Sequence, residues 1–130
     1  MTGVVLDASA LLALLLAEPG ADRVKAGLDG SVMSTVNLAE VVSHYAKLGV
    51  ARSDIEALLR PLPIRWAPVD AALSYEAGML RPLTVEGGLS LGDRYCLALA
   101  KREDRPALTA ERRWSAIAEA AGVVVEMIRR

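Results

Sequence analysis

Residues 2–20 of the 130-residue chain read TGVVLDASALLALLLAEPG, and the hydrophobic pattern of this stretch changes at Asp7. The β-branched and aliphatic run at residues 2–6 predicts a short strand buried on both faces, because it does not alternate apolar with polar residues. The leucine-rich run that follows predicts a helix capped by Ser9. Residues 18–20 predict its end, since proline cannot continue helical hydrogen bonding. A strand that leads directly into a helix is typical of an α/β fold.

The same alternation continues to the end of the chain. Further strands are predicted at residues 31–35, 64–67, 107–109 and 123–126. Further helices are predicted at residues 21–28, 37–48, 55–59, 70–81, 90–103 and 111–121, with Asn37, Ser53, Asp70 and Ser90 as N-terminal caps and residues 82–88 as a loop. We therefore expect one domain over residues 1–130, an α/β three-layer sandwich with a mainly parallel central sheet flanked by helices.

Composition excludes several classes of protein. An apolar fraction of 53% is too high for a disordered tail. With 15 Lys and Arg against 16 Asp and Glu, the chain has no overall attraction to nucleic acid or anionic lipid, so any such contact needs a local patch. Aromatic residues make up 4%, which argues against a surface of stacked rings for RNA. The single cysteine, Cys96, excludes disulfide and zinc-finger scaffolds. The apolar run at residues 8–17 is too short to span a bilayer, so we expect a soluble, cytoplasmic protein.

Two acidic residues come directly after predicted strands. Asp7 follows residues 2–6, and Glu111 lies just after residues 107–109. In an open parallel sheet, ligands bind outside the carboxyl ends of the strands, so both residues occupy positions typical of a site. Each also has a purely structural interpretation: Asp7 could cap the next helix, and Thr109 could cap the last helix with Glu111 in its first turn.

Asp93 lies near the start of a predicted helix and shares an apolar face with Leu97 and Ala100. A carboxylate on that face should be half-buried, and an ionised buried group needs a cation, a metal or several backbone donors. Free N–H groups and the dipole of the first helical turn could meet this need on their own. Both interpretations of Asp93 can hold at once.

Glu40 belongs to a polar helical stripe with Asn37, His44 and Lys47, which could simply face water. Carboxylates gathered at one sheet edge would repel one another, however, and such a cluster implies a bound hard cation. Ligand sets made only of oxygen favour Mg²⁺ or Mn²⁺ over zinc, and the single histidine, His44, is a poor zinc ligand candidate.

Four segments carry a family resemblance: VVLDASALLALL, STVNLAEVVSHYAKLG, GLSLGDRYCLALAKR and ALTAERRW. Together they resemble the PIN-domain family, and within it the VapC-type toxins of bacterial and archaeal toxin–antitoxin pairs. The resemblance covers essentially the whole chain, and LSLGDRYCLALA is its most specific part. It implies an Mg²⁺- or Mn²⁺-dependent endoribonuclease that cleaves single-stranded or loop RNA.

The resemblance also implies roles for particular residues. Asp7, Glu40 and Asp93 occupy three of the acidic positions of the family, with Asp7 and Asp93 as the metal ligands. The fourth position usually carries Asp, and Glu111 here sets its carboxylate about one methylene further out, so direct metal ligation by Glu111 is left open. Ser9 and Thr109 match hydroxyl positions that help orient the acidic groups.

Partners follow from the resemblance as well. They are a homodimer, a cognate VapB-like antitoxin that inhibits the toxin in a heterotetramer or larger assembly, and an RNA substrate. Arg94, Arg112 and Arg113 lie next to acidic candidates and are candidate RNA contacts, although for each one taken alone a solvated surface residue is the more ordinary explanation. Two other readings remain: a PIN fold that serves only as an interaction module, and a receiver-like signalling domain, for which the chain lacks an acidic pair after its first strand and a late lysine.

Overall fold

The computed structural model describes residues 3–84 and 88–130. These residues form a five-stranded sheet in the order β3-β2-β1-β4-β5, in which every neighbouring pair of strands is parallel. The strands are β1 (Val5–Leu6), β2 (Ser31–Ser34), β3 (Ile64–Ala67), β4 (Ala107–Thr109) and β5 (Val125–Met127). The first strand in the sequence is therefore the central one, and Val5 and Leu6 are fully buried, which confirms the predicted burial on both faces.

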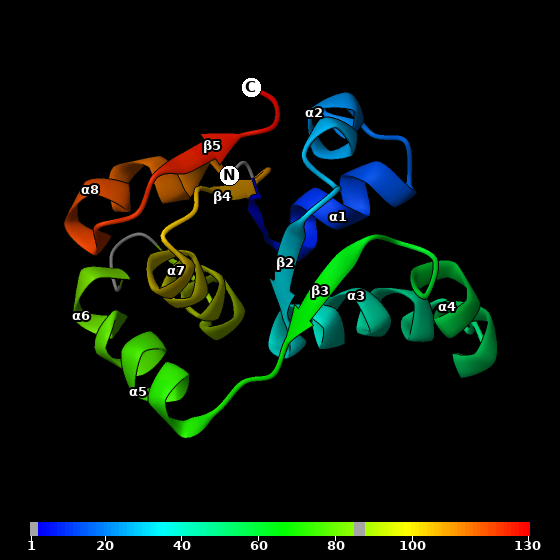
Figure 1. The fold of residues 1–130 in the computed structure, drawn as a ribbon, viewed down its shortest axis with the longest axis horizontal. Coiled ribbons are helices and arrows are strands. Elements are labelled where there is room, and N and C mark those ends of the chain that lie inside the picture. The colour runs from blue at the N-terminus through cyan, green and yellow to red at the C-terminus, as the bar shows by residue number, and fades with distance from the viewer. Residues whose placement is uncertain (1–2, 85–87) are drawn as a thin grey trace.

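Helices cover both faces of the sheet (Figure 1). They are α1 (Ala8–Leu15), α2 (Ala21–Ala26), α3 (Thr35–Lys47), α4 (Arg52–Leu59), α5 (Ala71–Met79), α6 (Arg81–Thr84), α7 (Leu91–Glu103) and α8 (Ala118–Ala121), with a 3₁₀ turn at Arg112–Ala116. Adjacent strand residues enter opposite cores. Val5 packs with α5 and α7, whereas Leu6 packs with α1 to α4. This alternation follows the period of two along a strand and confirms the predicted three-layer α/β sandwich.

Three predicted helix caps are wrong. Asp7 rather than Ser9 caps α1, and Ser34 rather than Asn37 caps α3. Ser53 does not cap α4, which begins after Ala51 with no side-chain cap. α1 begins directly after Asp7, and α3 begins directly after Ser34, the last residue of β2. In both helices the polar residue that ends the extended segment is therefore the cap. The predicted caps Asp70 and Ser90 are confirmed, at the starts of α5 and α7.

Some element bounds also differ from the prediction. Residues 82–84 belong to α6 instead of a loop, because proline is tolerated in the first turn of a helix, while residues 85–87 of the predicted loop lie outside the described residues. The helix predicted at residues 111–121 divides into the 3₁₀ turn and α8. Trp114 within the 3₁₀ turn and Ile117 directly after it are both buried.

No helix within residues 3–84 and 88–130 combines the length and the apolar character needed to cross a membrane.

Candidate active site

Asp7 lies at the carboxyl end of the central strand β1 and is 2% exposed. Its Oδ2 accepts hydrogen bonds from the hydroxyl of Ser9 at 2.5 Å and the hydroxyl of Thr109 at 3.0 Å. The backbone N–H of Ser9 also donates to Oδ2, at 3.4 Å, which is the cap of α1. Asp7 is thus a helix cap, as one of its sequence interpretations predicts, and also a buried carboxylate at the end of the central strand.

Burial raises the pKa of Asp7 from 3.8 to about 7. Desolvation is the main cause, the hydrogen bond from Ser9 opposes it, and the negative charge of Asp93 adds to it. The hydrogen bond from Thr109 lowers the pKa, and the charge of Glu40 raises it further. Ionisation of Asp7 is therefore unfavourable in the folded protein, and a nearby cation would lower its free-energy cost.

Asp93 is 8% exposed in the first turn of α7. Its Oδ2 accepts a hydrogen bond from the backbone N–H of Ser90 at 2.9 Å, and its own N–H donates to the hydroxyl of Ser90 at 3.2 Å. This reciprocal capping box satisfies one carboxylate oxygen of Asp93 through the backbone. The charge of Asp93 still raises the pKa of both Asp7 and Glu40, so the three carboxylates lie within electrostatic range of one another.

Glu40 does not simply face water. Its Oε1 accepts a hydrogen bond at 2.7 Å from Nδ2 of Asn37, a side chain that is fully buried. Its carboxylate lies against Gly92, where a Cβ atom would come within 2.3 Å of Oε2. Partial burial raises the pKa of Glu40, the Asn37 bond lowers it, and the charge of Asp93 raises it. The solvated-stripe interpretation is wrong for Asn37 and Glu40.

Glu111 lies two residues after Thr109, the end of β4, and its carboxylate has a different partner. Its Oε2 accepts a hydrogen bond from Arg113 at 3.2 Å, and its backbone N–H donates to Thr109 Oγ1 at 3.0 Å. Its charge is not among the causes of the raised pKa of Asp7 or Glu40. The structure therefore brings together Asp7, Glu40 and Asp93, and shows Glu111 in an ion pair with Arg113.

The three arginines named as RNA contacts differ in their surroundings. Arg113 also donates to the carbonyl of Gly88 at 2.9 Å, so it ties two segments together. Arg112 is exposed. Arg94 is half-buried, and its Nε atom is buried with no hydrogen-bond partner among the described residues.

The donor set of the cluster fits a hard cation. Within the described residues, each carboxylate has one oxygen fixed by protein hydrogen bonds: Oδ2 of Asp7, Oδ2 of Asp93 and Oε1 of Glu40. The second oxygen of each accepts no hydrogen bond from that part of the chain. Among residues 3–84 and 88–130, no three Asp, Glu, His or Cys side chains are placed so that they could hold a metal ion together. Mg²⁺ needs fewer, since it commonly binds through one or two carboxylates and fills its shell with water and phosphate.

Comparison with known proteins decides the family. The PIN domain family model matches residues 4–120. The chain belongs to the PIN domain family. The receiver-like alternative is thereby wrong.

Solved structures with this PIN fold cover almost the entire chain. VapC20 of Mycobacterium tuberculosis, described as a Sarcin-Ricin loop cleaving toxin, is 21% identical with a TM-score of 0.74, and the match covers 94% of this chain and 97% of that one. The DNA-bound VapBC of Salmonella typhimurium is 16% identical with a TM-score of 0.73, covering 98% and 99%. A toxin–antitoxin complex from Klebsiella pneumoniae is 21% identical with a TM-score of 0.69, covering 94% and 96%. At these identities the likeness establishes a shared fold. A search of curated protein sequences finds no match.

Sequence reasoning missed two residues that shape the acidic cluster of this PIN domain. Asn37 was placed on a polar stripe, but its partner Gly92 is 55 positions away, so only the tertiary structure reveals the contact. Gly92 lies within the motif LSLGD, and its position next to Asp93 was the available signal. A glycine beside a buried acid can mark the close approach of another group.

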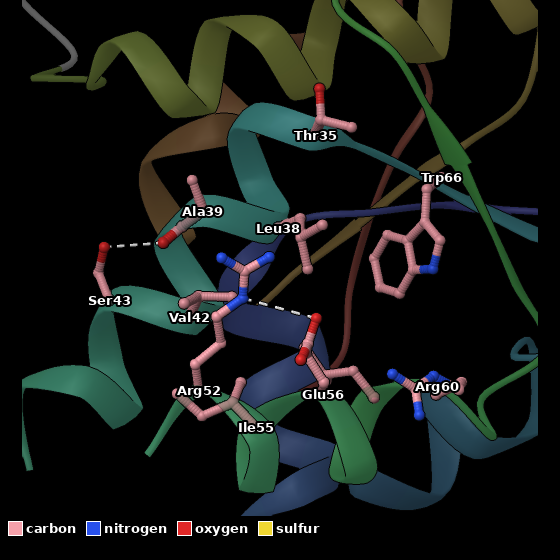
Figure 2. Close-up of a pocket in the computed structure, with 11 residues that line it drawn as sticks. Thr35, Leu38, Ala39, Val42, Ser43, Arg52, Ile55, Glu56, Arg60 and Trp66 are labelled. Carbon is pink, nitrogen blue, oxygen red and sulfur yellow. Dashed lines mark hydrogen bonds and ion pairs between the residues drawn. The ribbon is translucent and has the colours of Figure 1, made fainter. Parts of the chain in front are cut away.

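A separate groove of about 630 Å³ lies between α3, α4 and β3 (Figure 2). Apolar side chains line most of it, including Leu38, Val42 and Trp66, and Arg52 pairs with Glu56 at 3.6 Å in its wall. None of the three clustered carboxylates lines this groove. The groove and the acidic cluster use different faces of α3.

Proposed function

We propose that this PIN domain, a single domain over residues 1–130, is a metal-dependent endoribonuclease that hydrolyses RNA phosphodiester bonds and acts as the toxin of a toxin–antitoxin pair. The observation that carries the proposal is the cluster of Asp7, Glu40 and Asp93, three mutually repelling carboxylates of which two are buried at one end of the sheet. A fold alone would not require such a cluster, because burying like charges together is unfavourable.

Asp7 and Asp93 are the proposed ligands of Mg²⁺ or Mn²⁺, with Glu40 beside them. When bound, such an ion lowers the pKa of a coordinated water and stabilises negative charge that develops on the phosphate. Hydrogen bonds within the protein orient the two carboxylates. Ser9 and Thr109 fix Oδ2 of Asp7, and Ser90 fixes Oδ2 of Asp93, which leaves one oxygen of each carboxylate for other partners.

Glu111 has a proposed supporting role at the edge of the site. Its carboxylate pairs with Arg113 in the structure, and in this proposal Glu111 turns toward the cluster when Arg113 binds phosphate instead. Arg94, Arg112 and Arg113 are the proposed phosphate contacts for RNA. Neutralising all three should flatten the dependence of RNA binding on salt.

Water, and not the 2′-hydroxyl of the RNA, is the proposed nucleophile. A ribonuclease that activates the 2′-hydroxyl needs a general base such as histidine, and the single histidine, His44, makes an edge contact with Tyr45 on α3. Hydrolysis by water should leave a 5′-phosphate and a 3′-hydroxyl on the products.

The proposed partners are a cognate VapB-like antitoxin and a second copy of the chain. The structural neighbours include toxin–antitoxin complexes from Klebsiella pneumoniae and Salmonella typhimurium, which supports this proposal. Exposed apolar side chains on α5, Tyr75 at 77% and Met79 at 72%, are compatible with a homodimer. A monomeric mass for the purified chain would contradict the dimer.

The proposed activity is tested by incubating the purified protein, free of antitoxin, with total RNA in Mg²⁺, Mn²⁺ or EDTA and mapping new 5′-phosphate ends. Asp93→Asn removes one charge of the cluster with little change in shape, so cleavage should be lost while the fold is kept. Asp104→Asn is the matched control at the other end of α7, where Asp104 has a φ of 52° that asparagine adopts readily.

Discrete ends that require the metal, disappear in Asp93→Asn and persist in Asp104→Asn would support the ribonuclease. Ends that are equally abundant in EDTA, or in Asp93→Asn, would contradict it. A folded protein that binds metal but cuts no RNA would favour the interaction module.

A further inference from the structure

Asn37 is fully buried at the start of α3 and uses both ends of its side-chain amide. Its Oδ1 accepts a hydrogen bond from the hydroxyl of Ser34 at 2.7 Å. Its Nδ2 donates to Oε1 of Glu40 at 2.7 Å and to the backbone carbonyl of Gly92 at 3.1 Å. One amide therefore connects the carboxylate of α3 with the residue that precedes Asp93 in α7.

The partners fix the orientation of this amide. An ionised carboxylate and a backbone carbonyl can only accept hydrogen bonds, so the NH₂ group has to face Glu40 and Gly92. The hydroxyl of Ser34 can donate, so it faces the remaining oxygen. Ser34 is itself held as the cap of α3, where its hydroxyl accepts from the backbone N–H of Asn37 at 3.1 Å.

We propose that Asn37 is a positioning residue that holds the carboxylate of Glu40 within the acidic cluster and sets its place relative to Asp93. This inference rests on the proposed metal-dependent function. Glu40 has a flexible side chain and is repelled by Asp93, so without a donor its carboxylate would turn toward solvent. Asn37 supplies that donor from the preceding turn of the same helix, three residues away.

Gly92 makes the arrangement sterically possible. A Cβ atom at this position would lie 2.3 to 2.6 Å from the carboxylate atoms of Glu40. Glu40 therefore reaches the start of α7 only because residue 92 has no side chain, and Asn37 holds it there through a bond to the carbonyl of the same glycine. The two contacts together define where the Glu40 carboxylate lies.

A merely structural role for Asn37 is distinguishable from a positioning role by a double-mutant cycle with Glu40. The variants are Asn37→Ala, Glu40→Ala and the double variant, and the readout is the dissociation constant of Mn²⁺, measured by electron paramagnetic resonance on the metal-free chain. If Asn37 acts through Glu40, its removal matters only while Glu40 is present.

We expect Asn37→Ala to weaken Mn²⁺ binding by roughly tenfold, the lower end for residues that support a metal site through hydrogen bonds outside the ligand set. In the Glu40→Ala background the same change should have no further effect. Ser43→Ala is the control on α3, since it removes the hydrogen bond of Ser43 to the carbonyl of Ala39 without touching Glu40. Ser43→Ala should leave Mn²⁺ affinity unchanged.

Asn37→Leu keeps roughly the size of the side chain if the alanine variant does not fold. It removes both N–H donors without adding a charge, so it should also weaken Mn²⁺ binding in the wild-type background and not in Glu40→Ala. Unchanged affinity in these variants, or an equal loss with and without Glu40, would overturn the inference alone. A wild-type chain that binds no Mn²⁺ would overturn the proposed function and this inference with it.

Discussion

At the scale of single residues, Asp7 combines two tasks that usually fall to different side chains. It caps α1 through the backbone N–H of Ser9, and it contributes a buried charge to the acidic cluster. A capping role alone would leave the carboxylate exposed and its pKa low. The raised pKa of Asp7, about 7, therefore reflects the second task.

The pKa of Asp7 predicts how stability depends on pH without metal. The folded-state pKa of about 7 lies above the unfolded value of 3.8, so the stabilisation is complete below pH 3.8 and is lost as pH rises through 7. Asp7→Asn keeps the cap and removes the titration. In EDTA, the free energy of unfolding of the wild type should fall by about 2–3 kcal/mol relative to Asp7→Asn between roughly pH 5 and 8. Urea unfolding at several pH values measures this difference. If the free energies of unfolding of the wild type and Asp7→Asn change in parallel with pH, the prediction is contradicted.

The close contact between Gly92 and Glu40 leads to a second prediction for a single residue. Gly92→Ala places a Cβ against the Glu40 carboxylate, so Glu40 has to move, and we expect a loss of about 1–3 kcal/mol in the free energy of unfolding together with weaker Mn²⁺ binding. Gly78→Ala in α5 is the control, because nothing lies within 4 Å of its added Cβ. That variant should gain about 0.5–1 kcal/mol from helix propensity. Equal effects of the two substitutions would show that Gly92 has no special environment.

Sequence reasoning identified Asp7 and Asp93 more readily than Glu40, for a physical reason. The position of Asp7 follows from the rule on strand ends, and the apolar face around Asp93 is visible in helical spacing. The burial of Glu40 depends on contacts with Asn37 and with Gly92 on another helix, and helical periodicity does not contain that information. The pairing of Glu111 with Arg113 is likewise set by the turn after β4.

At the scale of elements, α7 begins with a capping box that also fixes Asp93, a carboxylate of the acidic cluster. The hydroxyl of Ser90 accepts from the backbone of Asp93, and the carboxylate of Asp93 accepts from the backbone of Ser90. The start of the helix and the position of the carboxylate are therefore fixed by the same pair of hydrogen bonds. A substitution that removes the cap should therefore also release the Asp93 carboxylate from its position in the cluster.

Ser90→Ala should lower the free energy of unfolding by about 1 kcal/mol, the usual cost of a lost cap. It should also weaken Mn²⁺ binding, because Asp93 loses part of its support. Ser90→Thr restores the hydroxyl and should recover most of both quantities. If Ser90→Ala destabilises the chain but leaves Mn²⁺ affinity at the wild-type value, the cap does not hold Asp93 in place.

The elements themselves were predictable where one local signal dominated. The bounds of β3 and β4 match the prediction because short apolar runs are enclosed by turn residues. The division of residues 111–121 into a 3₁₀ turn and α8 was not predicted, because local helix propensity does not distinguish a 3₁₀ turn from an α-helix. The starts of α1 and α3 were misplaced because two polar residues close together could each serve as the cap.

At the scale of the whole molecule, the parallel sheet is what gathers residues that are far apart in sequence. β1 and β4 are neighbours, so Asp7 and Thr109 meet although 102 positions separate them. α7 contributes Asp93, and α3 contributes Glu40. The alternation of strands and helices predicts this convergence in outline, since carboxyl ends of parallel strands share an edge.

The central claim is that these carboxylates form one divalent-cation site centred on the buried Asp7. Calorimetric titration of Mg²⁺ at pH 7, in two buffers with different heats of ionisation, counts the protons released on binding. Because the pKa of Asp7 is about 7, the wild type should release about half a proton per ion, and Asp7→Asn should release none and bind far more weakly. Mg²⁺ binding without proton release and with the same affinity in Asp7→Asn would contradict the claim.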